Sequence, residues 1–334
     1  MIQPSIPLMF APIFKPKPWG GRQLATLLNK SLPQGDPIGE SWELADLPGN
    51  ESRVHHGPLA GRTLNELVQM WGRALLGNAP LVDRRFPLLI KFLDARDNLS
   101  VQVHPKPTGA DPGRFDAGVK HEAWYIVHAE PGARAYIGLK PGVTPRDLAQ
   151  AANTPHIVDL LHAWDATRGQ CFYLPSGTPH ALGAGIVAAE VQTPSDVTYR
   201  LYDWDRVDAA GRPRELHIEA ALANVRYDIR DNEIAQPPMR HRAELYELNR
   251  VAACDRFQVD VVRLLPGRAV EILGNRMRIW IILAGKGHVK RERYDSSHDC
   301  HCGPGDVVLI PADAEPIGFD MEEDAEFLEV SVPV

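Results

Sequence analysis

Polar and apolar residues alternate between residues 99 and 104 in a way that is unusual for a surface strand. The apolar positions are Leu99, Val101 and Val103, and the polar positions are Ser100, Gln102 and His104. This period of two predicts a β-strand, because successive side chains of a strand point to opposite faces. The polar face carries hydrogen-bonding and metal-ligating groups, so we expect it to point into a binding site.

A second pattern places a histidine behind a tight turn. Residues 169–180 read G-x5-P-x-G-x2-H, with Gly169, Pro175, Gly177 and His180 at the defined positions. Glycine and proline at these offsets favour a strand, a turn and a second strand, which would direct the imidazole inward. Together the two patterns predict a metal ion held inside a small β-barrel.

Short apolar stretches separated by turn signals make up most of the remaining chain. Pro-Gly pairs occur at 131–132, 141–142, 266–267 and 304–305, which favours an all-β barrel or sandwich. Three stretches favour helices. They are a capping box at 63–66 followed by apolar positions to 76, a Thr-Pro start at 144–145 with apolar positions to 161, and residues 216–225.

The C-terminal part repeats the histidine motif in a degenerate form. Gly305, Pro311, Asp313 and Pro316 follow the same spacing, with Asp in place of the second glycine and Pro in place of the histidine. This repeat predicts two related barrels. We expect a metal-binding domain at 1–236 with helical insertions, a linker at 237–242 and a second barrel at 243–334 without metal ligands. Its strands are expected at 257–265, 279–283, 307–310 and 326–332.

Composition and charge narrow the class of protein. The chain has 334 residues, 44% of them hydrophobic and 24% charged, which is ordinary for a globular protein. The longest clean apolar run, at 279–284, is too short to cross a membrane, and no secretory signal is expected at the proline-rich start. The net charge of -7 argues against a nucleic-acid surface. Four cysteines without framework spacing favour a reducing, cytoplasmic location.

Four side chains fit the needs of a catalytic metal, which usually has three or four protein ligands and an open position. They are Gln102, His104, Glu122 and His180. Two imidazoles and one carboxylate suit a borderline divalent ion such as Zn²⁺, while the amide adds a ligand without charge. Each residue alone has an ordinary alternative: a packed histidine, a hydrogen-bonded core amide or a carboxylate at a strand edge.

Several segments resemble one enzyme family over nearly the whole chain. They are PWGG at 18–21, GESWE at 39–43, PLLIK at 87–91, LSVQVHP at 99–105, KHE at 120–122, PSGTPHA at 175–181, EVQ at 190–192 and SDVTYR at 195–200. In order and combination these segments resemble the short, zinc-dependent type I mannose-6-phosphate isomerases. The resemblance implies two cupin barrels, one Zn²⁺ per chain, and metal ligation by Gln102, His104, Glu122 and His180.

The family reaction implied by this resemblance interconverts mannose 6-phosphate and fructose 6-phosphate. Such an isomerisation needs an electrophile for the enediolate, a proton-transfer group and cations for the phosphate. Arg200 resembles the family's active-site arginine, on a stretch where Thr198, Arg200 and Tyr202 are expected to share a face. Glu190 is the expected proton-transfer base or its partner. The remaining candidates are Lys120 for catalysis, Lys91 for phosphate binding or proton transfer, and Ser100 for the phosphate.

Two other functions remain open from the residues alone, because a barrel with imidazole ligands does not choose a reaction. They are a metal-dependent cupin oxygenase and a non-catalytic sugar-phosphate-binding cupin. We expect a sugar phosphate as the small-molecule partner, no nucleic acid or membrane, and a monomer or weak homo-oligomer. The run HDCHC at 298–302 is expected to be an exposed hairpin loop that binds metal at most adventitiously, and His55-His56 to lie in a surface loop.

Overall fold

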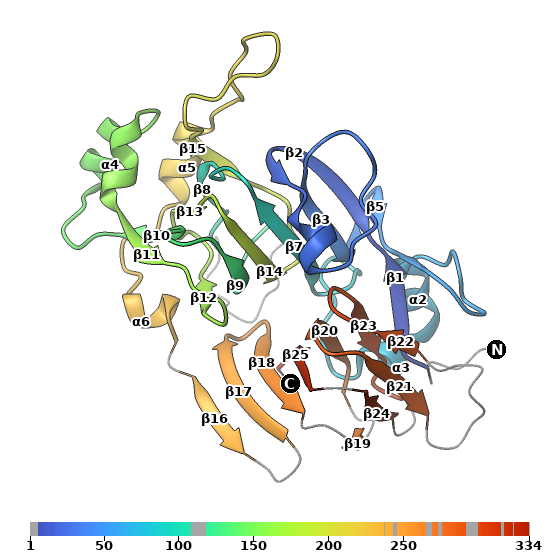
Figure 1. Cartoon of the computed structure of the whole chain (residues 1–334). Helices are drawn as coiled ribbons and strands as arrows, with labels where there is room; N and C mark the ends of the chain where they lie inside the picture. The colour runs from blue at the N-terminus through green and yellow to red at the C-terminus, as the bar shows by residue number, and fades with distance from the viewer. Residues whose placement is uncertain are drawn as a thin grey trace.

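The protein is mostly β, with two barrels built from facing sheets (Figure 1). The computed structural model describes residues 6–333 apart from 108–117, 237, 243–245, 265–268, 273–275, 292–299, 315–316 and 323. The strands are short, and turns connect most of them. The expected mostly-β fold is therefore confirmed.

Two sheets form the first barrel. The six-stranded sheet has the order β12 (Cys171–Leu174), β9 (Glu122–Ala129), β14 (Ile186–Gln192), β7 (Leu89–Ala95), β2 (Ile13–Gly21) and β3 (Ile38–Leu44). The five-stranded sheet has the order β11 (Leu161–Asp165), β10 (Arg134–Leu139), β13 (His180–Leu182), β8 (Val101–Val103) and β15 (Tyr199–Tyr202). Apolar side chains from both sheets, among them Trp124 and Leu182, pack in one core cluster.

Helices cover the outer face of the five-stranded sheet. They are α4 (Pro145–Ala151), the 3-10 helix η1 (Pro155–Leu160) and α5 (Ile218–Asn224). Val101 and Val103 pack in this helical layer, so the apolar face of β8 points out of the barrel and its polar face points in. The alternation at residues 99–104 therefore belongs to a strand whose polar side faces the interior, as predicted.

Two further sheets form the second barrel. The eight-stranded sheet has the order β16 (Met239–Arg242), β17 (Tyr246–Ala253), β18 (Gln258–Leu264), β25 (Ala325–Ser331), β20 (Arg278–Ala284), β23 (Val307–Ile310), β1 (Leu8–Ala11) and β6 (Arg53–Val54). The four-stranded sheet has the order β19 (Ala269–Ile272), β24 (Ile317–Met321), β21 (Gly287–Arg291) and β22 (Cys300–Cys302). The four C-terminal strands predicted from the sequence are present within about a residue of the expected bounds.

The remaining elements are short. They are β4 (Asp46–Leu47), β5 (Asn50–Glu51), α1 (Gln23–Leu27), α2 (Leu64–Trp71), α3 (Arg73–Leu76) and α6 (Asp231–Ile234). The predicted capping box of α2 is confirmed, because Thr63 and Glu66 exchange side-chain-to-backbone hydrogen bonds of 2.7 and 3.1 Å. The single helix expected after Thr144 is wrong. It divides into α4 and η1 where Asn153 adopts a φ of 60°, a left-handed conformation that ends a helix.

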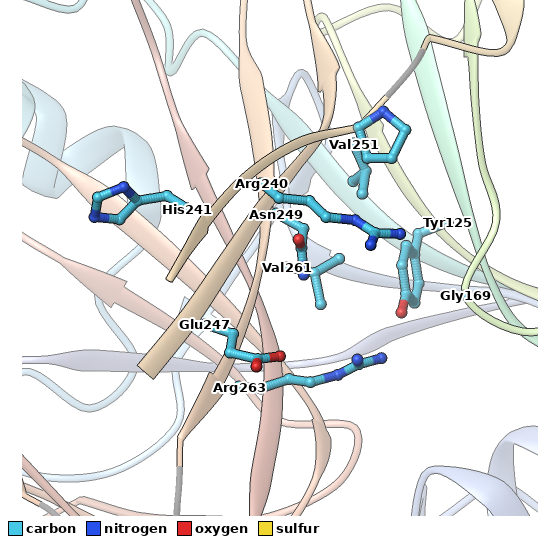
Figure 2. Close-up of a pocket in the computed structure, with 10 residues that line it drawn as sticks. Tyr125, Gly169, Arg240, His241, Glu247, Asn249, Val251, Val261 and Arg263 are labelled. Atoms are coloured by element: carbon cyan, nitrogen blue, oxygen red, sulfur yellow. The ribbon is translucent and has the colours of Figure 1, made fainter. Parts of the chain in front are cut away.

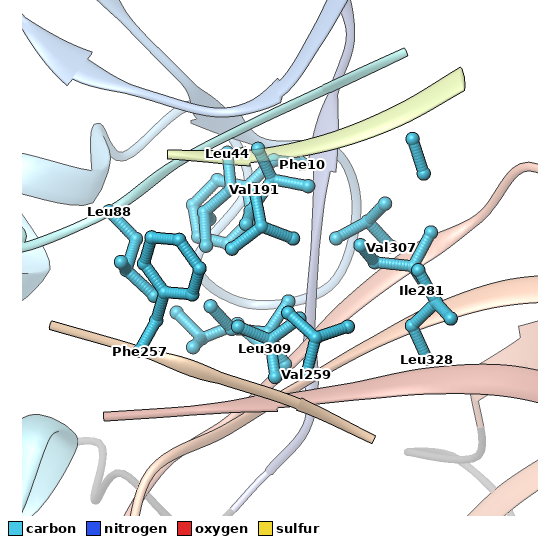
Figure 3. Packing of buried hydrophobic residues seen from close by; sticks show 14 of the residues in the cluster. Phe10, Leu44, Leu88, Val191, Phe257, Val259, Ile281, Val307, Leu309 and Leu328 are labelled. Atoms are coloured by element: carbon cyan, nitrogen blue, oxygen red, sulfur yellow. The ribbon is translucent and has the colours of Figure 1, made fainter. Parts of the chain in front are cut away.

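An apolar layer joins the two barrels (Figure 3). Leu44 and Val191 from the six-stranded sheet pack in one cluster with Val259, Ile281 and Leu328 from the eight-stranded sheet. Strands of the six-stranded sheet are therefore buried on both faces, which explains the fully buried run of β14. The polar interior of the first barrel is thus held by packing on both sides.

Chain segments cross between the two halves. β1 pairs with β23 of the second barrel through Leu8 and Leu309. The linker expected at 237–242 is wrong for Met239–Arg242, which form β16 and pair with β17; residue 237 lies outside the described residues. The division at 1–236 and 243–334 stays a prediction, since β1 extends the second half's sheet.

Matching hydrogen bonds support the internal repeat. The backbone amide of Gly169 donates a 2.9 Å hydrogen bond to the Ile126 carbonyl, and that of Gly305 donates a 2.8 Å hydrogen bond to the Ile282 carbonyl. Both glycines have positive φ, 89° and 94°, a conformation that glycine adopts without steric cost. Each precedes a strand by the same two residues. Pro316, the last position of the degenerate copy, lies outside the described residues.

Candidate metal centre

Three neighbouring strands place the polar side chains of the five-stranded sheet in one row. His180 of β13 is directly opposite Gln102 of β8, and Gln102 is directly opposite Arg200 of β15. Residues opposite one another in an antiparallel pair share a face. The strand register therefore brings together residues that are nearly one hundred positions apart in the chain.

Glu122 reaches the same interior from the facing sheet. Its Oε2 atom lies 3.2 Å from His104 Nε2 and 3.5 Å from His180 Nε2. All three side chains are buried, with exposures of 1–2%. The three residues form one of the clusters in the described chain whose ligand atoms converge closely enough to hold a metal ion.

Contacts at the Nδ1 atoms fix the orientation of the His104 and His180 rings relative to Glu122. Nδ1 of His104 is 2.8 Å from the Val197 carbonyl, and Nδ1 of His180 is 2.8 Å from the Thr178 carbonyl. A carbonyl only accepts, so each Nδ1 carries the proton and each Nε2 keeps a lone pair directed at Glu122. Burial lowers the pKa of both imidazoles, that of His180 to about 3, so both are neutral at pH 7.

Two lone-pair nitrogens and a carboxylate oxygen cannot hydrogen-bond to one another. Burial acts to raise the pKa of Glu122, but the adjacent Lys120 contributes most to holding the pKa well below its usual range. The Glu122 oxygens are buried without a hydrogen-bond partner among the described residues, although Lys120 forms an ion pair with Oε1. The donor set therefore fits a divalent cation, which can take a lone pair from each of the two nitrogens and the carboxylate.

Gln102 borders the cluster. Its amide Nε2 is 3.3 Å from His180 Nε2, and its Oε1 accepts a 3.1 Å hydrogen bond from Ser100. In this orientation the amide nitrogen faces the cluster, so ligation through Oε1 requires the amide to turn over. The structure brings Gln102 to the site without placing its oxygen at the convergence point.

Lys91 and Glu190 lie on the interior face of the six-stranded sheet, directly opposite one another. Lys91 Nζ is 3.4 Å from Glu190 Oε2, 3.7 Å from Glu40 Oε2 and 3.7 Å from Asp196 Oδ1. Burial acts to lower the pKa of Lys91, but these carboxylates outweigh it and raise the pKa. Lys91 is therefore a buried cation shared by three acidic groups.

Glu190 has the opposite shift. Burial raises its pKa to about 7, with Lys120 and Lys91 opposing the rise and Glu122 adding to it. Trp124 donates a 2.9 Å hydrogen bond from Nε1 to Oε1. Its proton affinity therefore lies near neutral pH, where a carboxyl group can both take and return a proton.

Two acidic residues that contact Lys91, Glu40 and Asp196, were not among the predicted site residues. Glu40 accepts hydrogen bonds from Trp42 and an ion pair from Lys17 at 2.6 and 2.9 Å. Burial acts to raise the pKa of Glu40, but Lys91 and Lys17 outweigh it and lower the pKa to about 2. The available signal was that both acidic residues lie in segments that carry the family resemblance, GESWE at 39–43 and SDVTYR at 195–200.

Arg200 and Ser100 lie at the end of the polar row. Arg200 Nε donates to Ser100 Oγ at 3.2 Å, and NH1 donates to the Glu215 carbonyl at 2.8 Å. The expectation that Tyr202 shares the face of Arg200 is wrong. A β-bulge follows Arg200, so Tyr202 pairs with Val101 and packs in the outer apolar layer with it.

The expected exposed hairpin loop at HDCHC is wrong for Cys300–Cys302, which form strand β22. Cys300 and Cys302 are buried, whereas His301 is exposed. Strand alternation thus separates the histidine from the two thiols. Residues 298 and 299 lie outside the described residues. His55 and His56 are exposed in a loop, as expected.

A separate cavity of about 500 Å³ lies between the two halves (Figure 2). Tyr125 and Gly169 line it from the first barrel, and Arg240, Glu247 and Arg263 line it from the second. None of the predicted site residues lines this cavity. The predicted chemistry is therefore confined to the interior of the first barrel.

Comparisons with known proteins agree with this geometry. Residues 8–133 match the family model described as phosphomannose isomerase type I, catalytic domain. The chain is 31% identical over 328 residues to the probable mannose-6-phosphate isomerase GmuF of Bacillus subtilis, covering 96% of this chain and 98% of GmuF. The chain belongs to the type I phosphomannose isomerase family. It is also 39% identical to mannose-6-phosphate isomerase ManA of B. subtilis, over 70% of each chain.

A solved structure extends the likeness of this phosphomannose isomerase family member to its whole fold. The crystal structure of the mannose 6-phosphate isomerase from B. subtilis superimposes with a TM-score of 0.86 at 29% identity, covering 98% of this chain and all of that chain. The expected family, enzyme class and cupin-type fold are confirmed. Within the described residues, no helix has the length and hydropathy to cross a bilayer.

Proposed function

We propose that this chain interconverts mannose 6-phosphate and fructose 6-phosphate in a zinc-dependent reaction that passes through an enediolate. One observation carries the proposal. The lone-pair nitrogens of His104 and His180 both lie within 3.5 Å of Glu122 Oε2, in a buried cluster of two imidazoles and a carboxylate that suits a divalent cation. The names of the related proteins supply the substrate pair.

His104, Glu122 and His180 would hold the ion, with Gln102 as a fourth ligand after its amide turns over. Zinc suits two imidazoles and one carboxylate, and when bound it polarises substrate oxygens as a Lewis acid. The carbonyl groups of Val197 and Thr178 keep the Nδ1 protons in place. This arrangement fixes the ring orientation and raises the basicity of each Nε2.

Glu190 is the proposed proton-transfer base. Its pKa of about 7 leaves a substantial fraction ionised at neutral pH, and Trp124 fixes its orientation. Lys91 forms an ion pair with the other carboxylate oxygen of Glu190. Lys120, buried beside Glu122 and 3.4 Å from His104 Nε2, is the proposed group that stabilises negative charge on the substrate or returns the proton to it.

The sugar phosphate is proposed to bind toward Arg200 and Ser100. These residues form the end of the polar row, where Ser100 is buried and Arg200 half-buried, and Arg200 presents a fixed guanidinium that suits an anion. Lys91 stays a candidate for the phosphate. Its three carboxylate contacts favour a role in holding Glu190 over direct phosphate binding.

A coupled assay with mannose 6-phosphate tests the proposal on purified protein before chelation, after chelation and after zinc is restored. We expect fructose 6-phosphate to form before chelation, to fall by at least about 100-fold after it, and to return with zinc. No fructose 6-phosphate in any zinc-loaded sample would overturn the proposal. A sugar-phosphate-binding cupin would instead bind the substrate without turnover.

A pair of histidine variants assigns the ligands. His180→Ala is expected to lose the buried zinc and turnover while staying folded, because the second barrel does not depend on that imidazole. His128→Ala, on the half-exposed end of β9, is the matched control and should keep both. Retention of zinc at the buried site by His180→Ala would contradict the ligand assignment.

A further inference from the structure

A second group of metal-ligating side chains lies on the outside of the second barrel. It is distant in the sequence from the buried trio of the first barrel and belongs to a different sheet. It consists of His288, His301 and Glu322, whose ligand atoms all lie within 4.8 Å of one another. The two imidazole ring centroids are 3.7 Å apart. His288 Nε2 is 3.3 Å from Glu322 Oε1. Neither the proposed isomerisation nor the internal repeat uses these residues.

The backbone holds these three side chains in register. His288 of β21 is directly opposite His301 of β22, so the two rings share one face of the sheet. Val289 and Cys302 point to the other face and pack in the apolar core of the barrel. Glu322 directly follows β24, and its backbone amide donates to the Lys286 carbonyl at 3.0 Å. The cluster therefore draws on two paired strands and on the residue that directly follows a third.

The distances between these three side chains fit a shared cation better than a single hydrogen bond. Four-coordinate zinc with ligand distances near 2.1 Å has ligand atoms about 3.4 Å apart, close to the 3.3 Å between His288 Nε2 and Glu322 Oε1. His288 Nδ1 is buried without a hydrogen-bond partner in the described part of the chain. A His288–Glu322 hydrogen bond would engage two of the three groups, whereas a shared cation would engage the second imidazole as well.

We propose that His288, His301 and Glu322 form a second site for a divalent transition-metal ion such as Zn²⁺, Ni²⁺ or Cu²⁺. The two imidazoles select these ions over Mg²⁺ and Ca²⁺, which prefer oxygen ligands. A bound ion would tie β21, β22 and the end of β24 together. A cavity of about 520 Å³ adjoins the site and is lined by His301 and Glu322, so water can complete the coordination and the ion can exchange.

The surroundings set the expected strength of binding. Lys286 and Lys30 line the same cavity, and their charges oppose a cation. Glu322 and His301 are exposed, in contrast to the buried trio of the first barrel. We therefore expect the second ion to bind more weakly than the buried one and to leave first during dialysis against a chelator.

Metal stoichiometry of the full chain tests the proposal. The metal-depleted protein is equilibrated with excess zinc, freed of unbound ion by gel filtration and analysed for metal. We expect about two ions in the unmodified chain and about one in the double variant His301→Ala/Glu322→Gln, with isomerase turnover unchanged in that variant. His55→Ala/His56→Ala is the matched control. It removes an exposed pair of contacting imidazoles without a carboxylate and should keep both ions.

Two readouts separate this site from the proposed active site. His180→Ala should lose the buried ion and turnover but keep the exposed ion, and in that background Cu²⁺ should give an electron paramagnetic resonance spectrum with two nitrogen ligands. An unchanged metal content in His301→Ala/Glu322→Gln would overturn the proposal. If that variant is unfolded by circular dichroism, Glu322→Gln alone must weaken zinc binding at least about 10-fold, or the proposal fails.

Discussion

The two barrels keep the same tryptophan–glutamate pair but surround it differently. In the first barrel Trp124 is opposite Glu190 and donates to it at 2.9 Å. In the second, Trp280 is opposite Glu329 and donates to it at 3.1 Å. The repeat therefore extends beyond the glycine and proline positions to an interior polar pair. That pair is a property of the barrel, so it does not by itself make a site.

The decisive difference lies four residues before the equivalent isoleucines, Ile126 and Ile282. The first barrel has Glu122 there, and the second has Arg278. Arg278 Nε is 3.5 Å from Glu329 Oε1, and Arg276 NH2 is 3.2 Å from the same atom. Guanidinium groups thus supply the positive charge in the second barrel. At this position the first barrel therefore has a carboxylate beside two imidazoles, and the second has a guanidinium that pairs with the glutamate of the tryptophan–glutamate pair.

Exchanging this residue should produce the largest effect. Glu122→Arg places a guanidinium beside two imidazoles and removes the only carboxylate of the trio. We expect loss of the buried ion and at least about a 1,000-fold fall in kcat/KM, because several kcal/mol of charge stabilisation are lost. Metal analysis and the coupled assay check it. Arg278→Lys in the second barrel is the control, and its turnover should match that of the unmodified chain.

The glutamates of the two pairs should respond differently to neutralisation. Glu190→Gln is expected to lower kcat by about 100- to 10,000-fold. In the unmodified enzyme kcat/KM should rise with pH as Glu190 ionises, through a limb at or below its pKa of about 7, because a bound cation lowers that pKa further. Glu190→Gln removes this limb.

Glu329→Gln is the matched variant in the second barrel. It leaves Arg276 and Arg278 without their charged partner, so it should cost about 1–3 kcal/mol in the free energy of unfolding. Its pH–rate profile should be unchanged. If Glu190→Gln keeps the acid limb, the proton-transfer group lies elsewhere.

The smallest effect is expected from removing the indole N–H donors. Trp124→Phe deprives Glu190 of a hydrogen bond to its charged form, which raises the pKa of Glu190 and moves the acid limb of kcat/KM to higher pH. Trp280→Phe should cost a similar 1–3 kcal/mol or so of unfolding free energy without moving the limb. Equal pH–rate profiles for the two variants would show that the first pair has no part in proton transfer.

Local patterns of the sequence predicted the two histidines of the trio, whereas Glu122 was assigned by the family resemblance. His104 directly follows the strand that carries Gln102, and His180 follows a turn whose glycine and proline positions fix its direction. The two histidine patterns depend on near neighbours. The carboxylates around Lys91 could not be predicted in the same way, because Glu40 and Asp196 meet Lys91 only through strand pairing and a loop contact between distant segments.

The sequence also did not predict two local departures, a side chain on the other face of a strand and a strand in place of a loop. The bulge after Arg200 moves Tyr202 to the outer layer, and nothing in the residue types there signals an extra residue. From the sequence alone, Cys300–Cys302 were expected in an exposed hairpin loop, but pairing with β21 makes them a strand. In each case a long-range partner sets the local geometry.

The pairing of Leu8–Ala11 with β23 also has a consequence for how the chain is made. Strand β1 leaves the ribosome long before its partner, since Met9 and Val308 are nearly 300 positions apart in the sequence. The eight-stranded sheet therefore closes only after β23 has been made. Such a high sequence separation slows folding and leaves an early strand edge in need of protection. The second barrel is thus completed by a strand that precedes every strand of the first barrel in the sequence.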